Sequence, residues 1–302
     1  MEMLDVQYKK EARHALALML GYIIVFQAVA SFSWRLFSSI STAMSSGIPY
    51  YLGVAAGLLV IFIGTSKIDQ RAIWQQIRTI PRKPTARTIV TLLALIMLAN
   101  MFFGIWSNLV EHIFQVFGLT TRAQLETASA NGKDSLSMII YVTVVAPIFE
   151  EFIFRGYLLH YFSKYSQKLA VFVTAFFFGI YHMNIAQTPF AFCLGLLLAY
   201  TALTYGLRWS IFVHFCNNAF GQVVSILAVH WGGAINAVSS MFMLVMAVGS
   251  LVFLIRHASQ IKSWLQANVI PPHYLTWSLL NWPAGVAYVL CVISIVMGLD
   301  RI

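Results

Sequence analysis

Long apolar runs dominate this sequence and constrain its fold more than any other feature. A helix needs about 20 apolar residues to cross the hydrocarbon core of a bilayer, and most of the runs reach or approach that length. The sequence therefore predicts an all-α fold, a polytopic bundle of transmembrane helices. The runs cover residues 14–34, 48–64, 89–107, 136–159, 169–186, 189–206, 209–230, 234–255 and 277–298.

The composition supports an integral membrane protein. Hydrophobic residues make up 60% of the chain and charged residues only 10%, whereas soluble domains carry about 25% charged residues. The net charge of +9 could suggest a nucleic-acid partner, but the basic residues are spread over the short connections between apolar runs. We therefore expect the lipid bilayer to be the partner, with no nucleic acid bound, and a location in the cell membrane.

The number of spans is predicted as eight to nine. The 48–64 run is short, so it could be half-inserted and leave eight complete spans. The first run ends near Ala28, Val29 and Ala30, which resemble a signal-peptidase site. Its length favours a retained span. Because no internal repeat is evident, residues 1–302 are expected to form one membrane domain.

The basic residues predict the orientation. With the N-terminus inside, nine spans leave 14 of the 19 Lys and Arg residues in cytoplasmic segments and 4 on the opposite side, and the last lies within a span. An excess of Lys and Arg in cytoplasmic loops is the usual rule for membrane proteins, so the sequence predicts N-in and C-out. The cytoplasmic segments would be 1–13, 65–88, 160–168, 206–208 and 256–276.

Two adjacent glutamates, Glu150 and Glu151, are the only acidic residues inside the predicted spans. An ionised side chain near the bilayer centre costs on the order of 3 kcal/mol, so such residues usually face a bundle interior or a wet cavity. Glu151 and Arg155 are spaced i, i+4 and share a helix face. Glu150 is turned about 140° away from Arg155. Arg155 is therefore expected to neutralise Glu151, which leaves Glu150 without a partner on its own helix.

Partners for Glu150 must then come from other spans. His182 and His214 lie in later apolar runs, and Asn218 follows His214 at i+4 on the same helix face. A lone histidine in a membrane helix can simply cap a carbonyl group. A carboxylate, two imidazoles and an amide around a water molecule, however, form the chemical groups of a hydrolase: a general base, a proton carrier and an oxyanion site.

These residues fall into three motifs that resemble a known family. The motifs are E-E-x-x-x-R at 150–155, F-x-x-x-H at 178–182 and H-x-x-x-N at 214–218, each in a separate apolar run. In this order they resemble the CPBP family, the CAAX prenyl endopeptidases of the Ras-converting-enzyme type and their bacterial relatives, which are often linked to bacteriocin processing or immunity. The resemblance covers a catalytic core of about 136–230.

The resemblance implies an intramembrane endopeptidase of the glutamate type that works without a metal. Glu150 would activate water with the help of His182. His214 and Asn218 would stabilise the tetrahedral oxyanion. The substrate would be a membrane-associated peptide or protein.

The same resemblance gives Glu151 and Arg155 a supporting role in holding the helix, in agreement with the i, i+4 argument. Two alternatives remain at this stage. One is a zinc enzyme built from the same Glu and His residues, although the sequence has no H-E-x-x-H motif. The other is a non-enzymatic membrane regulator, an immunity protein or a transporter.

Depth along the spans predicts a cavity that faces the cytoplasm. At 1.5 Å per residue, Glu150 lies roughly 12–14 Å from the cytoplasmic end of its run, His214 about 8 Å and Asn218 about 14 Å. The same estimate places His182 about 20 Å from the cytoplasmic end of its run. This is several ångströms deeper than the other site residues. A tilted helix 169–186, or one that starts below the headgroups, would close this gap.

Overall fold

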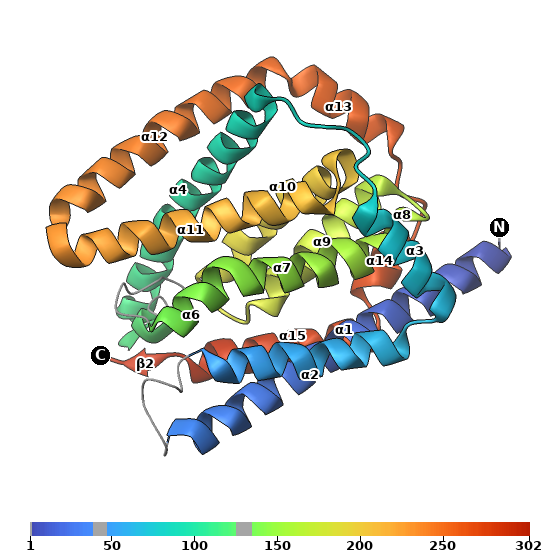
Figure 1. Ribbon diagram of the computed structural model, residues 1–302, viewed down its shortest axis with the longest axis horizontal. Coiled ribbons are helices and arrows are strands. Elements are labelled where there is room, and N and C mark those ends of the chain that lie inside the picture. The colour runs from blue at the N-terminus through green and yellow to red at the C-terminus, as the bar shows by residue number, and fades with distance from the viewer. Residues whose placement is uncertain (1, 39–46, 125–134) are drawn as a thin grey trace.

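The structure is a computed structural model that describes residues 2–38, 47–124 and 135–302. The described chain is almost entirely helical, which confirms the all-α prediction. Most of the long helices run roughly along the longest axis of the molecule, while α4 and α12 cross it obliquely (Figure 1). One short strand pair, β1 (Leu119–Thr120) with β2 (Asp300–Arg301), joins the C-terminal end to the residues after α4.

Each predicted apolar run overlaps at least one helix of the described chain. Six of these helices are long and apolar enough to cross a membrane, and α2, α9 and α15 are shorter, so the count of eight to nine spans stays a prediction. The helices are α1 (Glu2–Ser38), α2 (Ile48–Gly64), α4 (Ala86–Val116), the composite helix Leu136–Ser163, α9 (Gln167–Tyr181), α10 (Gln187–Tyr205), α11 (Leu207–Trp231), α12 (Gly233–Arg256) and α15 (Trp282–Met297).

The composite helix carries the glutamates and changes its winding along its length. It consists of α6 (Leu136–Ile140), the π-helix η1 (Tyr141–Val145), α7 (Ala146–Glu151), the π-helix η2 (Phe152–Leu158) and α8 (Leu159–Ser163). Three further short helices lie at one end of the bundle: α3 (Lys67–Arg78), α13 (Ala258–Ala267) and α14 (Tyr274–Leu279).

The predicted helix over 169–186 is wrong at its end, because α9 stops at Tyr181. Beyond it the chain turns, and Asn184 Oδ1 accepts hydrogen bonds from the N–H groups of Ala186 and Gln187. A side chain that binds nearby backbone N–H groups in this way competes with helical hydrogen bonding and favours a helix start. The apolar run is therefore divided between a helix and a capped turn.

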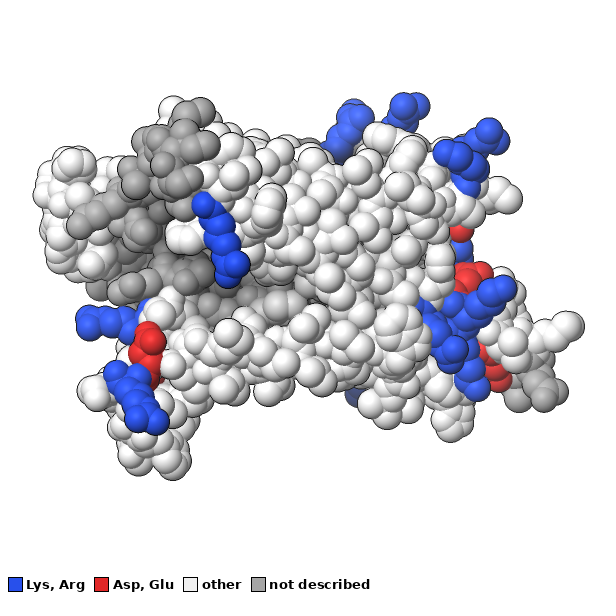
Figure 2. Space-filling model, turned by 90° about the horizontal axis from the view of Figure 1, so that it is seen from below, with Lys and Arg blue, Asp and Glu red and all other residues white. Residues whose placement is uncertain are grey.

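The five segments predicted to be cytoplasmic gather at one end of the molecule, next to the N-terminus in Figure 1. Contacts between them include Lys164 Nζ to a Glu11 carboxylate oxygen at 3.5 Å and Lys168 Nζ to the Leu265 carbonyl at 3.4 Å. Figure 2 shows Lys and Arg mostly toward the two ends of the visible face, with a broad surface between them that is largely free of charge. This distribution fits a membrane-spanning body, and the choice of the cytoplasmic side remains a prediction.

Glycines let α1 and α2 pack closely side by side. A Cβ atom at Gly57 would lie 2.6 Å from the ring of Tyr22, and one at Gly53 would lie 2.9 Å from the ring of Phe26. Real Cβ atoms do not approach other heavy atoms this closely. In membranes, where the hydrophobic effect does not drive helices together, small residues at contacts of this kind allow the close packing that holds helices in place.

We expect Gly57→Ala to separate α1 from α2 and to lower the free energy of unfolding by about 1–3 kcal/mol, the usual cost of overpacking. Gly104→Ala in α4 is the matched control, because nothing lies within 4 Å of a Cβ atom there. Both changes gain the same helix propensity from alanine, so the difference reports the steric clash. Thermal unfolding in detergent measures it, and equal melting temperatures for the two variants would contradict the packing argument.

Candidate active site

Pro147 determines the backbone just before the glutamates. In η1 the N–H of Ala146 donates to the Tyr141 carbonyl, which is the i to i+5 spacing of a π-helix. In that register the next donor would be residue 147 and its acceptor would be the Val142 carbonyl. Proline has no N–H. The side-chain amide of Asn218 supplies the missing donor, with Nδ2 2.8 Å from the Val142 carbonyl oxygen.

A second π-helix, η2, follows the glutamates directly, and the N–H of Leu159 after it donates to the Phe154 carbonyl. The short helix α7, with Glu150 and Glu151 at its end, therefore lies between two widened stretches. Single-turn π segments inside α-helices often mark functional sites. The apolar sequence around them gives no periodic signal for either segment.

Glu151 is the fully bonded carboxylate of the pair. Arg155 Nη1 lies 2.9 Å from one of its oxygens, and both side chains have 0% exposure. His214 Nδ1 lies 3.0 Å from the same oxygen, and the Ser210 hydroxyl donates to the other. Arg155 also donates to the Gly195 carbonyl at 3.3 Å. The ion pair expected from the i, i+4 spacing is thus present, with two further donors from α11.

Glu150 is placed very differently from its chain neighbour. Its carboxylate faces His214, with Oε2 3.8 Å from Nε2, and its side chain keeps 14% exposure. Within the described residues it has no other hydrogen bond or ion pair. Three tyrosines, Tyr22, Tyr141 and Tyr181, lie close enough to interact with it electrostatically. Glu150 is therefore an underbonded carboxylate in a polar site, as its position on the helix predicted.

The imidazole of His214 lies between the two glutamates. Its Nδ1 meets an ionised carboxylate of Glu151, and such a carboxylate can only accept hydrogen bonds. The proton must then be on Nδ1, which leaves Nε2 directed at Glu150. A carboxylate that fixes the ring and its tautomer in this way is a recurring arrangement for histidines at active sites.

His182 comes near the site but does not bond to Glu150. It caps the end of α9, and its Nδ1 lies 2.7 Å from the Phe178 carbonyl, so Nδ1 is the donor and Nε2 carries a lone pair. The ring of Phe178 contacts both imidazoles, with its centroid 4.8 Å from that of His182 and 5.7 Å from that of His214. Among the described residues no hydrogen bond or ion pair joins His182 to Glu150. The capped turn after α9 nonetheless brings His182 within one aromatic ring of His214, despite its predicted excess depth.

Asn218 belongs to a chain of amides that the sequence did not reveal. Asn100 Nδ2 donates to Asn217 Oδ1 at 2.8 Å, Asn217 Nδ2 donates to Asn218 Oδ1 at 3.0 Å, and Asn218 donates to the Val142 carbonyl. The chain links α4, α11 and η1. Asn218 is therefore held beside the site but commits one N–H to the backbone. An asparagine inside the 89–107 run was the available signal for Asn100.

Comparison with protein families gives one match. Residues 132–220 match the family model described as type II CAAX prenyl endopeptidase Rce1-like. The motif-bearing core is similar to this endopeptidase family. The match contains all six residues of the E-E-R, H and H-N motifs, and it confirms the resemblance predicted from them.

The Rce1-like match supports an intramembrane protease of the CAAX type and a membrane-associated substrate. It covers the composite helix, α9, α10 and the first half of α11, and it leaves the other helices outside. Searches among curated proteins and among solved structures find no match.

We expect Asn218→Ala to leave the Val142 carbonyl unpaired and to lower the free energy of unfolding by about 1–3 kcal/mol. Pro147→Ala restores an N–H at residue 147, which can bond that carbonyl, so Asn218→Ala should cost less in the Pro147→Ala background. Thermal unfolding of the two single variants, the double variant and the wild type measures this coupling. Additive effects of the two substitutions would show that an N–H at residue 147 and the Asn218 amide do not compete for the Val142 carbonyl.

Proposed function

We propose that this chain is an intramembrane endopeptidase that hydrolyses a peptide bond in a membrane-associated peptide or protein. One observation carries the proposal: of two adjacent glutamates, the buried Glu151 is bonded to Arg155, Ser210 and His214, whereas the partly exposed Glu150 faces only His214. A carboxylate that makes few bonds to its own protein can accept a proton from water and so act as a general base. The Rce1-like match over the same residues supports this choice.

In the proposed reaction Glu150 removes a proton from a water molecule, and the water oxygen attacks the carbonyl carbon of the scissile bond. The Nε2 lone pair of His182 accepts the second hydrogen of the water and orients it, because its Nδ1–H is held by the Phe178 carbonyl. The carbonyl electrons move onto oxygen and form the tetrahedral oxyanion. Protonated Glu150 then gives its proton to the amide nitrogen as the C–N bond breaks, which yields a carboxyl and an amine.

The oxyanion would be stabilised by His214 and Asn218. His214 is held by Glu151 through Nδ1, so its donor to the oxyanion would be an N–H on Nε2. Asn218 has two amide N–H groups and uses one for the Val142 carbonyl, which leaves the second for the oxyanion. Donors that are held in place before the reaction are worth a few kcal/mol each at an oxyanion.

The site is proposed to open toward the cytoplasm in the cell membrane. Support comes from the five segments at the N-terminal end of the bundle, which together hold 14 of the 19 Lys and Arg residues. α11 begins at this end with Leu207, so His214 lies about two helical turns below it. A substrate held at the cytoplasmic surface would reach the carboxylate by entering the bundle to that depth.

We expect Glu150→Gln to abolish cleavage, because an amide cannot accept the proton of water, and to leave the melting temperature close to that of the wild type. Comparing membrane peptidomes of cells with wild type and variant measures the activity and identifies the substrate. The matched control is Glu151→Gln, which leaves Arg155 charged and buried and should cost about 3–5 kcal/mol of stability. Normal turnover by a folded Glu150→Gln protein would refute the mechanism.

A zinc enzyme built from the same residues makes a different prediction. In the part of the chain that the structure describes, no group of three or more His, Cys, Asp or Glu is arranged to hold a metal ion. We therefore expect cleavage by the purified protein to persist after treatment with a strong chelator. Loss of activity that zinc alone restores would support the zinc mechanism instead.

The alternative function is a non-enzymatic membrane regulator, an immunity protein or a transporter. The same Glu150→Gln variant separates it from the peptidase. A regulator or immunity protein would keep its effect in cells with Glu150→Gln, because binding does not need a base. A transporter that uses the carboxylate would lose proton-coupled flux in liposomes without any change in the peptidome.

A further inference from the structure

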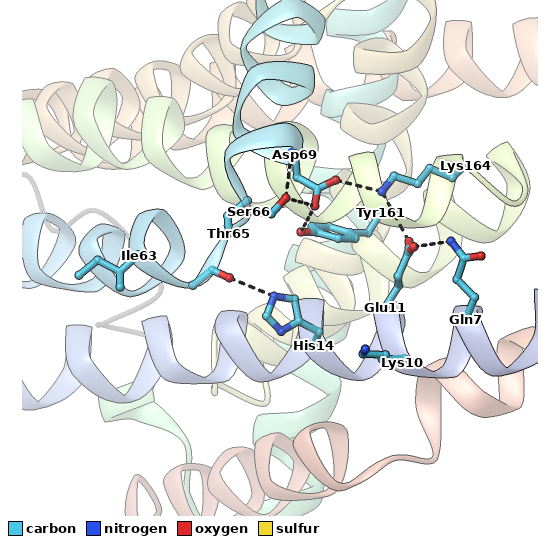
Figure 3. A pocket seen from close by; sticks show the side chains of 11 residues that line it. Gln7, Lys10, Glu11, His14, Ile63, Thr65, Ser66, Asp69, Tyr161 and Lys164 are labelled. Atoms are coloured by element: carbon cyan, nitrogen blue, oxygen red, sulfur yellow. Dashed lines mark hydrogen bonds and ion pairs between the residues drawn. The ribbon is translucent and has the colours of Figure 1, made fainter.

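A cavity of about 560 Å³ lies away from the glutamates, at the end of the molecule that carries the N-terminus. Figure 3 shows its lining side chains arriving from α1, the end of α2, the start of α3 and α8. It is level with the ends of two apolar runs, since His14 begins the 14–34 run and Gly64 closes the 48–64 run. His14 Nε2 also donates to the Gly64 carbonyl at 3.1 Å. The cavity thus lies at the ends of two apolar runs, where we expect lipid headgroups to meet water.

The negative side of the cavity is formed by two carboxylates that share one ammonium. Lys164 Nζ lies 3.5 Å from Glu11 Oε2 and 3.2 Å from Asp69 Oδ1. Burial raises the pKa of Asp69, but hydrogen bonds from Ser66 and Lys164 and the charge of Lys164 outweigh it and lower the pKa to about 2. Tyr161 and His160 also bond to Asp69, so a new donor at this carboxylate would take the place of Lys164 Nζ. The formal charges of Glu11 and Asp69 together exceed that of Lys164.

The positive side is formed by Lys10, which makes no ion pair within the described residues and lies one residue before Glu11 on α1. Two lysines and two carboxylates thus line the same cavity, and their formal charges balance. Lys164 is also partly exposed, with 35% of its side chain accessible. Its flexible stem can turn from the carboxylates toward an anion bound near Lys10.

An exposed apolar strip adjoins the charged cavity. Ile63 lines the cavity and is 78% exposed, and Leu59 and Phe62 on the same part of α2 are exposed by more than half. In a bilayer these side chains face the acyl chains. A molecule that fills the cavity with a charged group can therefore lay a hydrocarbon chain along α2, which is the shape of an amphiphile.

We infer that this cavity binds the headgroup of a membrane aminophospholipid. The primary ammonium of the lipid donates to Glu11 and Asp69, and its phosphate lies against Lys10 and Lys164. Charge-assisted hydrogen bonds of this kind are the strong ones. A choline headgroup has no N–H to donate, so the site discriminates between headgroups of equal net charge. This binding is independent of peptide hydrolysis.

The test uses the full-length purified protein in vesicles that contain equal parts of phosphatidylethanolamine and phosphatidylcholine. Mass spectrometry of lipids retained after mild detergent extraction measures the preference. We expect a preference of about tenfold for phosphatidylethanolamine, which corresponds to ~1.4 kcal/mol. Lys10→Gln and Glu11→Gln should each remove it. Arg13→Gln is the matched control for Lys10→Gln, because it removes a positive charge from an exposed position of α1 that does not line the cavity.

Three results would overturn the inference. Equal retention of the two lipids by the wild type would remove the need for an ammonium donor. A preference that survives both Lys10→Gln and Glu11→Gln, with all proteins shown to be folded by thermal unfolding, would place the lipid elsewhere. Soluble glycerophosphoethanolamine that displaces the lipid at equal concentration would show that the acyl chains contribute nothing and that the membrane is not the source.

Discussion

The buried Glu151–Arg155 ion pair is the interaction on which the rest of the site depends. Two charges with no exposure to solvent are expensive in a membrane bundle, and they are tolerated only when paired and further hydrogen-bonded. The surplus acceptor capacity of Glu151 is taken up by Ser210 and His214 from α11. The Glu151 carboxylate therefore pairs with Arg155 on its own helix, joins that helix to α11 and orients the His214 imidazole. Glu150 takes no part in these bonds.

Much of this arrangement could be predicted from the sequence because it follows from periodicity and composition. The nine apolar runs locate helices, and the i, i+4 spacing of Glu151 and Arg155 pairs them before any coordinates are seen. The underbonded state of Glu150 follows from the same angular argument. The three motifs also identify the family that residues 132–220 match. These inferences need only local geometry and a few unusual residues.

Other features depend on contacts between helices and could not be predicted. The polar residues His182 and Asn184 follow Tyr181, but polar residues alone do not distinguish the turn after α9 from a continued helix. Asn218 shares a helix face with His214, yet its amide is drawn to the Val142 carbonyl by a proline on another helix. The contact of the Phe178 ring with His214 likewise could not be predicted from the sequence. The bond of Asn218 is decided by a partner on another helix, whereas the end of α9 is decided by Asn184 within the turn itself.

The Val142 carbonyl, which lacks a donor at Pro147 and is bonded by Asn218, has a consequence for the evolution of this fold. A proline at this place removes the backbone donor for the Val142 carbonyl, and the Asn218 amide on α11 takes the place of that donor. We therefore expect the two positions to change together among homologues. In a homologue without the proline, the residue at position 147 can donate to the Val142 carbonyl. The asparagine at position 218 is then no longer needed for that bond, and selection can act on its role in catalysis alone.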